Sequence, residues 1–288
     1  MITTDSIQTL RAELQKARDQ KKRIGLVPTM GNLHAGHLSL LSIAQRESDY
    51  WVTSIFVNPM QFGPQEDFLN YPRTLESDQK ALSEAGCSAL FAPTVNEMYP
   101  EGMINHCSVV PADIACGLCG DYRQGHFEGV ATVVAKLFNI VQPDVAVFGQ
   151  KDYQQLAVIR TLARDLNFTT RVLSGPTLRA QDGLALSSRN GYLAPADRET
   201  AAQLYRCICQ IADRIKQDDC DVHKIVESGK ESLEHSGFCV DYLEVRSANS
   251  LATPSRHDKS LVVLVAAYLG ATRLIDNLEF DVIAPLSV

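Results

Sequence analysis

Two histidines three residues apart, His34 and His37, occupy the stretch of this chain best suited to phosphate chemistry. The apolar run 24–27 before them predicts a buried strand, and leucines at helical spacing follow from residue 38. The pair therefore stands where a strand passes into a helix N-terminus, an end that favours phosphate. Imidazoles there can donate to a phosphate that gains charge in a transition state. A polar cap of the turn is the simplest alternative, but two histidines in His-x-Gly-His favour nucleotide chemistry.

Two later segments also carry polar groups that suit phosphate. They are Lys151, Asp152 and Gln155, after the strand-like run 145–148, and Ser187, Ser188 and Arg189 in a polar stretch. A lysine just beyond a strand can reach a phosphate as a compact cation, and hydroxyls beside an arginine suit phosphate oxygens. A helix cap by Asp152 and ordinary loop serines are the alternatives. Neither of the two common nucleotide loops, Gly-x-Gly-x-x-Gly and Gly-x4-Gly-Lys-Ser/Thr, occurs.

Other candidates suit an organic substrate or a metal. Asn58 and Gln61 follow the strand-like run 51–57 and offer uncharged polar contacts, and Arg123 and His126 form a basic pair before a long apolar helix. A helix cap is the alternative for that pair. The acidic residues that could hold the Mg²⁺ that often accompanies ATP are Asp67, Glu76 and Asp78, each with a solvated helix face as the alternative.

The elements that must position these residues alternate along the first part of the chain. Predicted strands cover 24–28, 51–57, 89–92, 145–148 and 170–173; predicted helices cover 6–20, 37–48, 74–85, 127–141 and 153–166. This alternation predicts an α/β fold, with a mostly parallel sheet and helices on both faces. Ligands of such sheets bind beyond the carboxyl ends of the strands, where the residues at 29–37, 58–62 and 149–155 are expected to lie.

The pattern changes near residue 176. Helix-like segments at 197–216 and 221–235 precede strand-like runs at 239–246, 261–269 and 272–280, which predicts a smaller α+β domain. We expect two domains, 1–178 and 179–288, with the boundary within 176–186.

Composition narrows the class of partner. The 288 residues carry a formal charge of -7, so no global basic field attracts nucleic acid or anionic membranes, and small molecules are the expected ligands. We expect a cytoplasmic protein, because no apolar run is long enough to span a membrane and no signal-peptide core is present. Its eight cysteines are then expected to be reduced. Cys116 and Cys119 have metal-ligand spacing, with His106 and Cys107 nearby, so a zinc site stays open although a second pair is missing.

Seven motifs together give the chain a resemblance to a known family, the pantothenate synthetases (pantoate–β-alanine ligases). In order they are Val27-Pro-Thr-Met-Gly, His34-x-Gly-His37, Ser54-Ile-Phe-Val-Asn-Pro-x-Gln-Phe62, Tyr71-Pro-Arg-Thr74, Gly125-His-Phe-x-Gly-Val130, Phe148-Gly-x-Lys-Asp-Tyr-Gln-Gln155 and Asp182-Gly-Leu-Ala-x-Ser-Ser-Arg-Asn190. One such motif would be weak support, but seven at compatible spacing over nearly the whole chain are specific.

The resemblance implies a Rossmann-type nucleotidyltransferase domain, a smaller C-terminal domain that forms a lid, and a homodimer. It implies that pantoate attacks the α-phosphate of ATP to give pantoyl adenylate and pyrophosphate. The amine of β-alanine then attacks the acyl carbon and releases AMP. Mg²⁺ is expected with ATP.

Roles carry over only where residues match the family motifs. The resemblance implies an ATP site formed by Met30, His34, His37, Gly149, Lys151, Asp152, Leu178, Leu186, Ser187, Ser188 and Arg189, with His37, His34, Lys151 and Arg189 as its catalytic members. It implies pantoate and β-alanine contacts from Gln61 and Gln155, with Asn58, Arg123 and His126 as secondary candidates, and Asp78 for the metal. The chain departs from common family residues at Asn32, Ala35, Gln124, Gln150, Ala180 and Gln181, none of which is assigned a phosphate or pantoate contact.

Three other functions are compatible with parts of this pattern. A pantetheine-phosphate or nicotinate-mononucleotide adenylyltransferase would keep AMP in its product, whereas a ligase releases it. An aminoacyl-tRNA synthetase shares adenylate chemistry, but this chain lacks a basic tRNA-binding surface. A silent binding protein would bind ATP without releasing pyrophosphate, and the intact His34, His37, Lys151 and Arg189 argue against it.

Overall fold

The computed structural model describes residues 1–64, 66–217 and 221–282. The chain divides into two compact units. The first, here called the N-terminal unit, comprises Met1–Gln150 and Gln154–Pro176; the second, the C-terminal unit, comprises Lys151–Tyr153 and Thr177–Val288.

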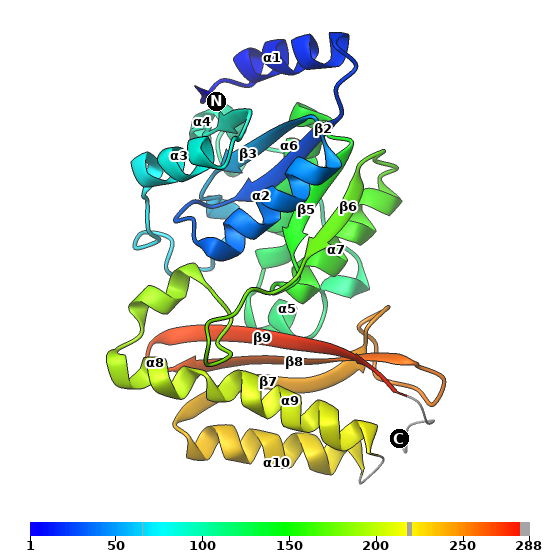
Figure 1. Ribbon diagram of the computed structural model, residues 1–288. Helices are drawn as coiled ribbons and strands as arrows, with labels where there is room; N and C mark the ends of the chain where they lie inside the picture. The colour runs from blue at the N-terminus through cyan, green and yellow to red at the C-terminus, as the bar shows by residue number, and fades with distance from the viewer. Residues whose placement is uncertain (65, 218–220, 283–288) are drawn as a thin grey trace. The chain divides into compact units, whose positions relative to one another are not determined.

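The N-terminal unit is built on a parallel sheet with the strand order β1-β4-β3-β2-β5-β6 (Figure 1). The strands are β1 (Ile2–Thr4), β2 (Ile24–Thr29), β3 (Tyr50–Ile55), β4 (Ala89–Phe91), β5 (Val145–Gly149) and β6 (Arg171–Gly175). The five predicted strands are confirmed, and β1 was missed. It has three residues and pairs only with β4 at the sheet edge, too short a run to show a period of two.

Helices flank this sheet. They are α1 (Ile7–Asp19), α2 (Ala35–Glu47), α3 (Leu75–Glu84), α4 (Val95–Met98), α5 (Cys119–Tyr122), α6 (His126–Val141) and α7 (Tyr153–Asp165), with short 3-10 helices η1 (Pro59–Gln61) and η2 (Asp113–Ala115). Ser6 caps α1 by accepting a hydrogen bond from the Thr9 N–H. Strands β2, β3 and β5 are buried along nearly their whole length, as expected for a parallel sheet covered on both faces.

Close packing of α2 on the sheet depends on a missing side chain. A Cβ at Gly175, at the end of β6, would lie 2.1 Å from Leu40 Cδ2 of α2. Leu40, Leu41 and Ala44 bury one face of α2 against the strand residues Val27 and Val147. The helix that begins with the histidine motif is therefore held firmly on the sheet.

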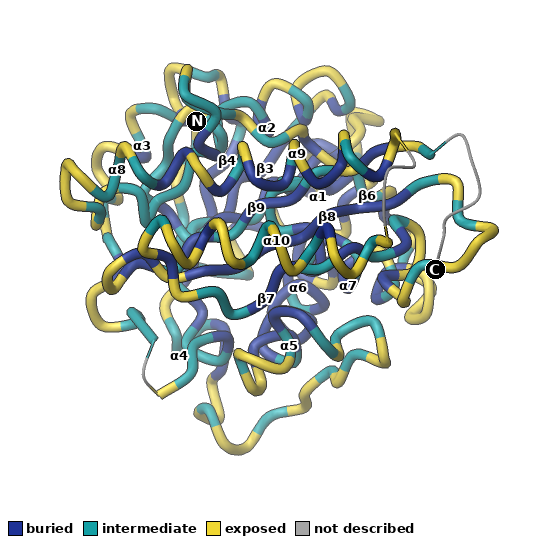
Figure 2. The backbone as a smooth tube through the Cα atoms, turned by 90° about the horizontal axis from the view of Figure 1, so that it is seen from below, coloured by how far each residue is buried: buried dark blue, intermediate teal, exposed yellow. Residues whose placement is uncertain are grey.

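The C-terminal unit has an antiparallel sheet of order β7-β8-β9, formed by β7 (Phe238–Ser247), β8 (Ser260–Leu269) and β9 (Thr272–Asp281). Its helices are α8 (Pro195–Ala201), α9 (Gln203–Lys216) and α10 (Val222–His235), and a 3-10 helix η3 covers Ser188–Tyr192. Figure 2 shows buried, half-buried and exposed residues along α9 and α10; α9 packs against β8 and β9, and α10 packs against β7. The predicted α+β class is confirmed, but the single helix expected over 197–216 is interrupted at Ala202.

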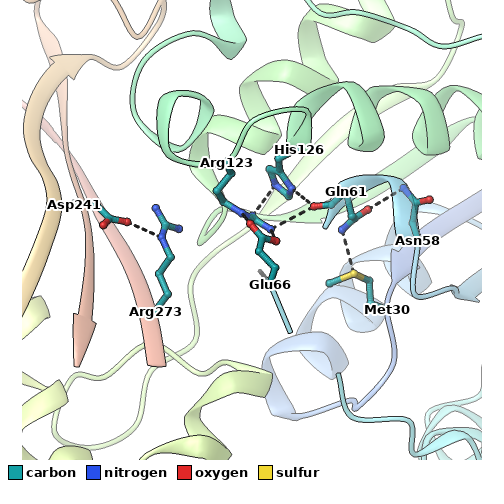
Figure 3. A network of polar contacts seen from close by, with 8 residues as sticks. All are labelled: Met30, Asn58, Gln61, Glu66, Arg123, His126, Asp241 and Arg273. Atoms are coloured by element: carbon teal, nitrogen blue, oxygen red, sulfur yellow. Dashed lines mark hydrogen bonds and ion pairs between the residues drawn. The ribbon is translucent and has the colours of Figure 1, made fainter. Parts of the chain in front are cut away.

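Two of the ion pairs in this unit involve β9. Arg273 on β9 donates from Nε to Asp241 Oδ2 on β7 at 2.7 Å, across the central strand (Figure 3). Arg179 makes a bidentate pair with Asp276 of β9 at 2.6 and 2.8 Å, and its guanidinium stacks 3.6 Å from the Tyr205 ring centroid. Since Arg179 belongs to a hairpin closed by the Leu186 N–H to Leu178 C=O bond, the second pair fixes that hairpin on β9.

None of the helices in residues 1–64, 66–217 and 221–282 is both long and apolar enough to cross a bilayer. The cysteines of these residues are all free thiols, and Cys220 lies outside the described residues.

Candidate functional site

The segments singled out by sequence follow adjacent strands at the carboxyl edge of the sheet. From β2 the chain passes through α2 to β3 on one side, whereas β5 pairs with β2 on the other side. The strand order thus reverses between β2 and β5, the place where open α/β sheets bind ligands. Residues 30–37 follow β2 and residues 150–155 follow β5, as predicted.

His34 and His37 cap the N-terminus of α2 reciprocally. His34 is the N-cap residue, and its Nδ1 accepts a hydrogen bond from the Gly36 N–H at 3.1 Å. The Nδ1 of His37 accepts from the His34 N–H at 3.3 Å, and the two ring centroids lie 4.1 Å apart. The polar cap that the sequence offered as an alternative to phosphate binding is therefore present. It also determines the protonation of the two rings.

The caps decide which ring nitrogen carries the proton. A backbone N–H can only donate, so Nδ1 is the acceptor in both rings, and the neutral imidazole must then hold its hydrogen on Nε2. Both side chains are half-buried at the positive end of a 13-residue helix. This arrangement presets two Nε2–H donors beside a helix N-terminus, a combination suited to phosphate oxygens.

Asp78 holds the turn that leads into this cap. The turn contains Gly31 with φ 84° and Asn32 with φ 50°, a conformation that asparagine tolerates better than most residues. Asp78 is buried on α3, and its two carboxylate oxygens accept the Asn32 N–H at 2.9 Å and the Leu33 N–H at 2.8 Å. Thr74 Oγ1 donates to the same carboxylate at 3.1 Å.

Asp78 is also the residue at which a metal is expected. A cation bound there would compete with the hydrogen bonds that order the turn, so the structure gives this carboxylate a structural role. The described part of the chain contains no group of three His, Cys, Asp or Glu residues that could hold a metal ion, the Cys116–Cys119 segment included. These contacts do not test the metal assigned to Asp78, and that assignment stays a prediction.

Gln61 and Asn58 form a buried amide pair after β3. Asn58 Nδ2 donates to Gln61 Oε1 at 3.3 Å and to the Gly129 carbonyl at 3.1 Å. Gln61 Nε2 donates to Met30 Sδ at 3.0 Å (Figure 3), which joins the segment after β3 to the segment after β2. A thioether is a weak acceptor, so this amide can exchange it for a better one.

Arg123 and His126 already have partners within the N-terminal unit. His126 is buried, with Nδ1 2.8 Å from the Gln61 carbonyl and Nε2 2.9 Å from Arg123 Nη1. Arg123 also makes a bidentate ion pair with Glu66 at 2.7 and 2.6 Å. These bonds do not test their contact with substrate, which stays a prediction.

Sequence reasoning missed two residues that shape this part of the site. A Cβ at Gly129 on α6 would lie 2.5 Å from the Met60 carbonyl oxygen and 2.6 Å from the Gln61 nitrogen, so only glycine allows η1 to pack there. The Tyr99 hydroxyl donates to Asn58 Oδ1 at 3.0 Å, and burial raises its pKa, which keeps it a neutral donor. Gly129 lies within a quoted motif, but for Tyr99 the sequence held no signal.

The segment after β5 changes character over a few residues. Gly149 ends the strand, Lys151 and Asp152 are half-buried, and Asn277 Nδ2 of β9 donates to the Lys151 carbonyl at 2.8 Å. Gln154 is buried, and its amide bonds only to main-chain groups of 114–119, whereas Gln155 is half-buried. Of the two adjacent glutamines, Gln154 is therefore the structural one.

The serine–arginine segment begins η3 in the C-terminal unit. Ser187 Oγ accepts the Arg189 N–H at 3.2 Å, and Asn190 Nδ2 donates to the Ala185 carbonyl at 3.0 Å. Leu178 and Leu186 pair through the main chain at the open end of the preceding hairpin. The structure thus brings Leu178, Leu186, Ser187, Ser188 and Arg189 into one local segment, while the histidine and glutamine groups belong to the N-terminal unit.

Comparison with known proteins gives consistent matches. The model of a family described as pantoate-beta-alanine ligase matches residues 2–279. A pantothenate synthetase of Pseudomonas fluorescens is 56% identical over 285 residues, covering 99% of this chain and 100% of that protein. That of Azotobacter vinelandii is also 56% identical, over 98% of this chain and 100% of its own.

Solved structures agree with these relatives. The crystal structure of pantothenate synthetase from Thermus thermophilus matches with a TM-score of 0.90 and 46% identity, covering 96% of this chain and 99% of that one. The pantoate-beta-alanine ligase of Francisella tularensis, complexed with β-γ ATP and β-alanine, matches with a TM-score of 0.81 and 34% identity, over 96% of this chain and 97% of its own.

Proposed function

We propose a mechanism for this chain from the premise that it belongs to the pantoate-beta-alanine ligase family. In the proposal a pantoate carboxylate oxygen attacks the α-phosphorus of ATP, and the bond to the pyrophosphate oxygen breaks. The resulting pantoyl adenylate is attacked at its acyl carbon by the amine of β-alanine. AMP leaves with the former carboxylate oxygen, and the new amide loses a proton to give pantothenate. The Francisella tularensis relative, bound to β-γ ATP and β-alanine, supports ATP as the co-substrate.

The observation that carries this proposal is the reciprocal cap of His34 and His37. It supports two preset Nε2–H donors at the N-terminus of α2, next to the point where the strand order reverses. We assign both to the triphosphate, where charge grows as pyrophosphate leaves. Lys151, Ser187, Ser188 and Arg189 are proposed to bind phosphate oxygens, and Met30, Gly149, Asp152, Leu178 and Leu186 to line the nucleotide site.

Gln61 and Gln155 are proposed to hold pantoate, and Gln61 also to help place β-alanine. The buried Asn58–Gln61 pair supports this role, because Asn58 fixes one end of the Gln61 amide while the weak Met30 contact leaves the other end exchangeable. No protein nucleophile is needed, since the substrate carboxylate attacks directly and positioning supplies several kcal/mol.

Mg²⁺ is proposed to arrive as part of the nucleotide substrate. Phosphate oxygens and water are ligands that Mg²⁺ keeps when it binds with a nucleotide, and Asp78 stays the proposed protein ligand.

The proposal is tested by pyrophosphate release from Mg-ATP with pantoate, before and after β-alanine is added. We expect release that requires pantoate, followed by AMP turnover and pantothenate on addition of β-alanine. His37→Ala should raise the barrier of adenylate formation by ~2–4 kcal/mol while pantoate binding changes little. A normal burst in that variant would contradict its assigned role. Absence of pantoate-dependent release from folded, ATP-binding protein would point to another acceptor.

A further inference from the structure

Two side chains from one distant segment, Arg123 and His126, reach the main-chain carbonyl of Gln61. His126 Nδ1 lies 2.8 Å from this oxygen and Arg123 Nη2 lies 3.5 Å from it, while Arg123 is paired with Glu66. Figure 3 shows Glu66, Arg123 and His126 in a row that leads to Gln61. None of these bonds involves the Gln61 side chain, whose amide faces Asn58 and Met30.

The geometry allows only one arrangement of protons in this row. A guanidinium has donors and no acceptor, so His126 Nε2 must accept from Arg123 Nη1 at 2.9 Å. A carbonyl can only accept, so His126 Nδ1 carries the hydrogen and donates it to Gln61. His126 is therefore held as a single neutral tautomer, with its proton directed at the main chain of the substrate-binding loop.

Glu66 orients the guanidinium that enforces this tautomer. Its two oxygens accept from Arg123 Nε and Nη2 at 2.7 and 2.6 Å, one edge of the planar fork, which leaves Nη1 directed at His126. The two side chains, Arg123 and Glu66, are only 16% and 24% exposed, so solvent screens this pair less than a surface pair. Loss of the carboxylate would free the fork to turn toward other acceptors.

We propose that Glu66, Arg123 and His126 are positioning residues that fix the Gln61 main-chain carbonyl in place. They thereby set the position of the Gln61 side-chain amide relative to pantoate. Glu66 is the new member, and the other two act through Gln61 rather than on substrate. The inference rests on the proposed function, because it requires Gln61 to hold pantoate. A shift of the carbonyl moves the whole residue, including the side-chain amide that contacts Asn58 and Met30.

The first test is a double-mutant cycle of Glu66→Gln and Gln61→Ala on the full-length chain. Pyrophosphate release is measured at varied pantoate with saturating Mg-ATP, and then at varied Mg-ATP with saturating pantoate. Glu66→Gln keeps the shape and removes the charge. It should raise the KM for pantoate by roughly 3- to 10-fold, as for loss of one hydrogen bond, with the KM for ATP unchanged. Glu84→Gln, at a side chain 68% exposed on α3, is the matched control and should change neither.

The cycle separates this inference from the proposed function. If Glu66 acts through Gln61, adding Glu66→Gln to Gln61→Ala should raise the pantoate KM no further. Additive effects, or an equal rise in the KM for ATP, would overturn the positioning role while the function of Gln61 stood. An unchanged pantoate KM in Gln61→Ala itself would remove Gln61 from the proposed site and overturn the inference with it.

A second pair of variants tests the tautomer and does not depend on Glu66. In His126→Asn the amide occupies the place of Nδ1 and can still donate to the Gln61 carbonyl; in His126→Gln it reaches toward the place of Nε2. The shorter asparagine should therefore keep a pantoate KM closer to that of the parent chain. If His126 only filled space, the larger glutamine should be the better replacement. A pantoate KM closer to that of the parent chain in His126→Gln than in His126→Asn would therefore contradict the proposal.

Discussion

Replacement of Asp78 by asparagine should loosen the turn that places His34 and His37. The native carboxylate accepts two main-chain N–H groups, from Asn32 and Leu33, and is only 2% exposed. Asparagine has nearly the same volume but only one oxygen. Either orientation of its amide therefore sets an NH₂ group against a backbone N–H group that can only donate.

The size of the effect follows from these two bonds. The backbone N–H that faces the NH₂ group becomes a buried, unsatisfied donor, which costs about 1–3 kcal/mol. The remaining bond changes from a charged to a neutral acceptor and weakens by about 1 kcal/mol. The Thr74 hydroxyl can rotate to accept from the new amide, so it adds little. We expect Asp78→Asn to lower the free energy of unfolding of the N-terminal unit by about 2–4 kcal/mol.

The single tryptophan of the chain makes this measurable. Trp51 is buried on β3, so its fluorescence in urea reports the N-terminal unit alone. Glu76→Gln is the matched control, since Glu76 is exposed on the same helix and loses the same charge. The pantoate-dependent pyrophosphate burst should fall in Asp78→Asn, because the turn sets the place of both imidazoles. An unfolding free energy within about 0.5 kcal/mol of the control, together with an unchanged burst, would refute the reasoning.

Three further predictions use other parts of the structure. Gly129→Ala should lower the free energy of unfolding by about 1–3 kcal/mol and raise the pantoate KM, because its Cβ would lie 2.5 Å from main-chain atoms of η1. Gly63→Ala is the control, since the nearest atom its Cβ would meet is 3.7 Å away. Equal pantoate KM values in the two variants would contradict the prediction. The hydrogen bond from Arg198 lowers the pKa of Asp182 from 3.8, so its contribution to stability is present above that pH and lost as pH falls through the native value. In Asp182→Asn the free energy of unfolding should therefore fall less as the pH is lowered than it does in the parent chain. The same pH dependence in both chains would show that the Asp182–Arg198 pair does not contribute to stability. Burial raises the pKa of Cys207 to about 11, so at pH 8 thiol reagents followed by mass spectrometry should label it much more slowly than exposed thiols in the folded chain, and equal labelling would argue against its burial.

Much of the fold could be predicted because buried elements show an apolar run or an apolar period in the local sequence. Strands β2, β3 and β5 are apolar runs between turn residues, and α2 and α6 show helical periodicity. Their alternation was enough to predict a parallel sheet and to place the residues after β2, β3 and β5 at its carboxyl edge. Elements with few residues or no period, such as β1 and the break at Ala202, show no such pattern.

The amino-acid sequence by itself determined the chemistry available to this protein: two histidines at a helix N-terminus, a glutamine and an asparagine after β3, and a lysine after β5. Only the tertiary structure decided how those groups are held. It assigned the protons of His34, His37 and His126, gave Asp78 to a turn 46 residues away, and brought Glu66 to Arg123 across 57 residues. Periodicity along a chain records which face is buried, because burial repeats with each turn or pleat. The partner of a single polar atom does not repeat, and it is known only when distant segments meet.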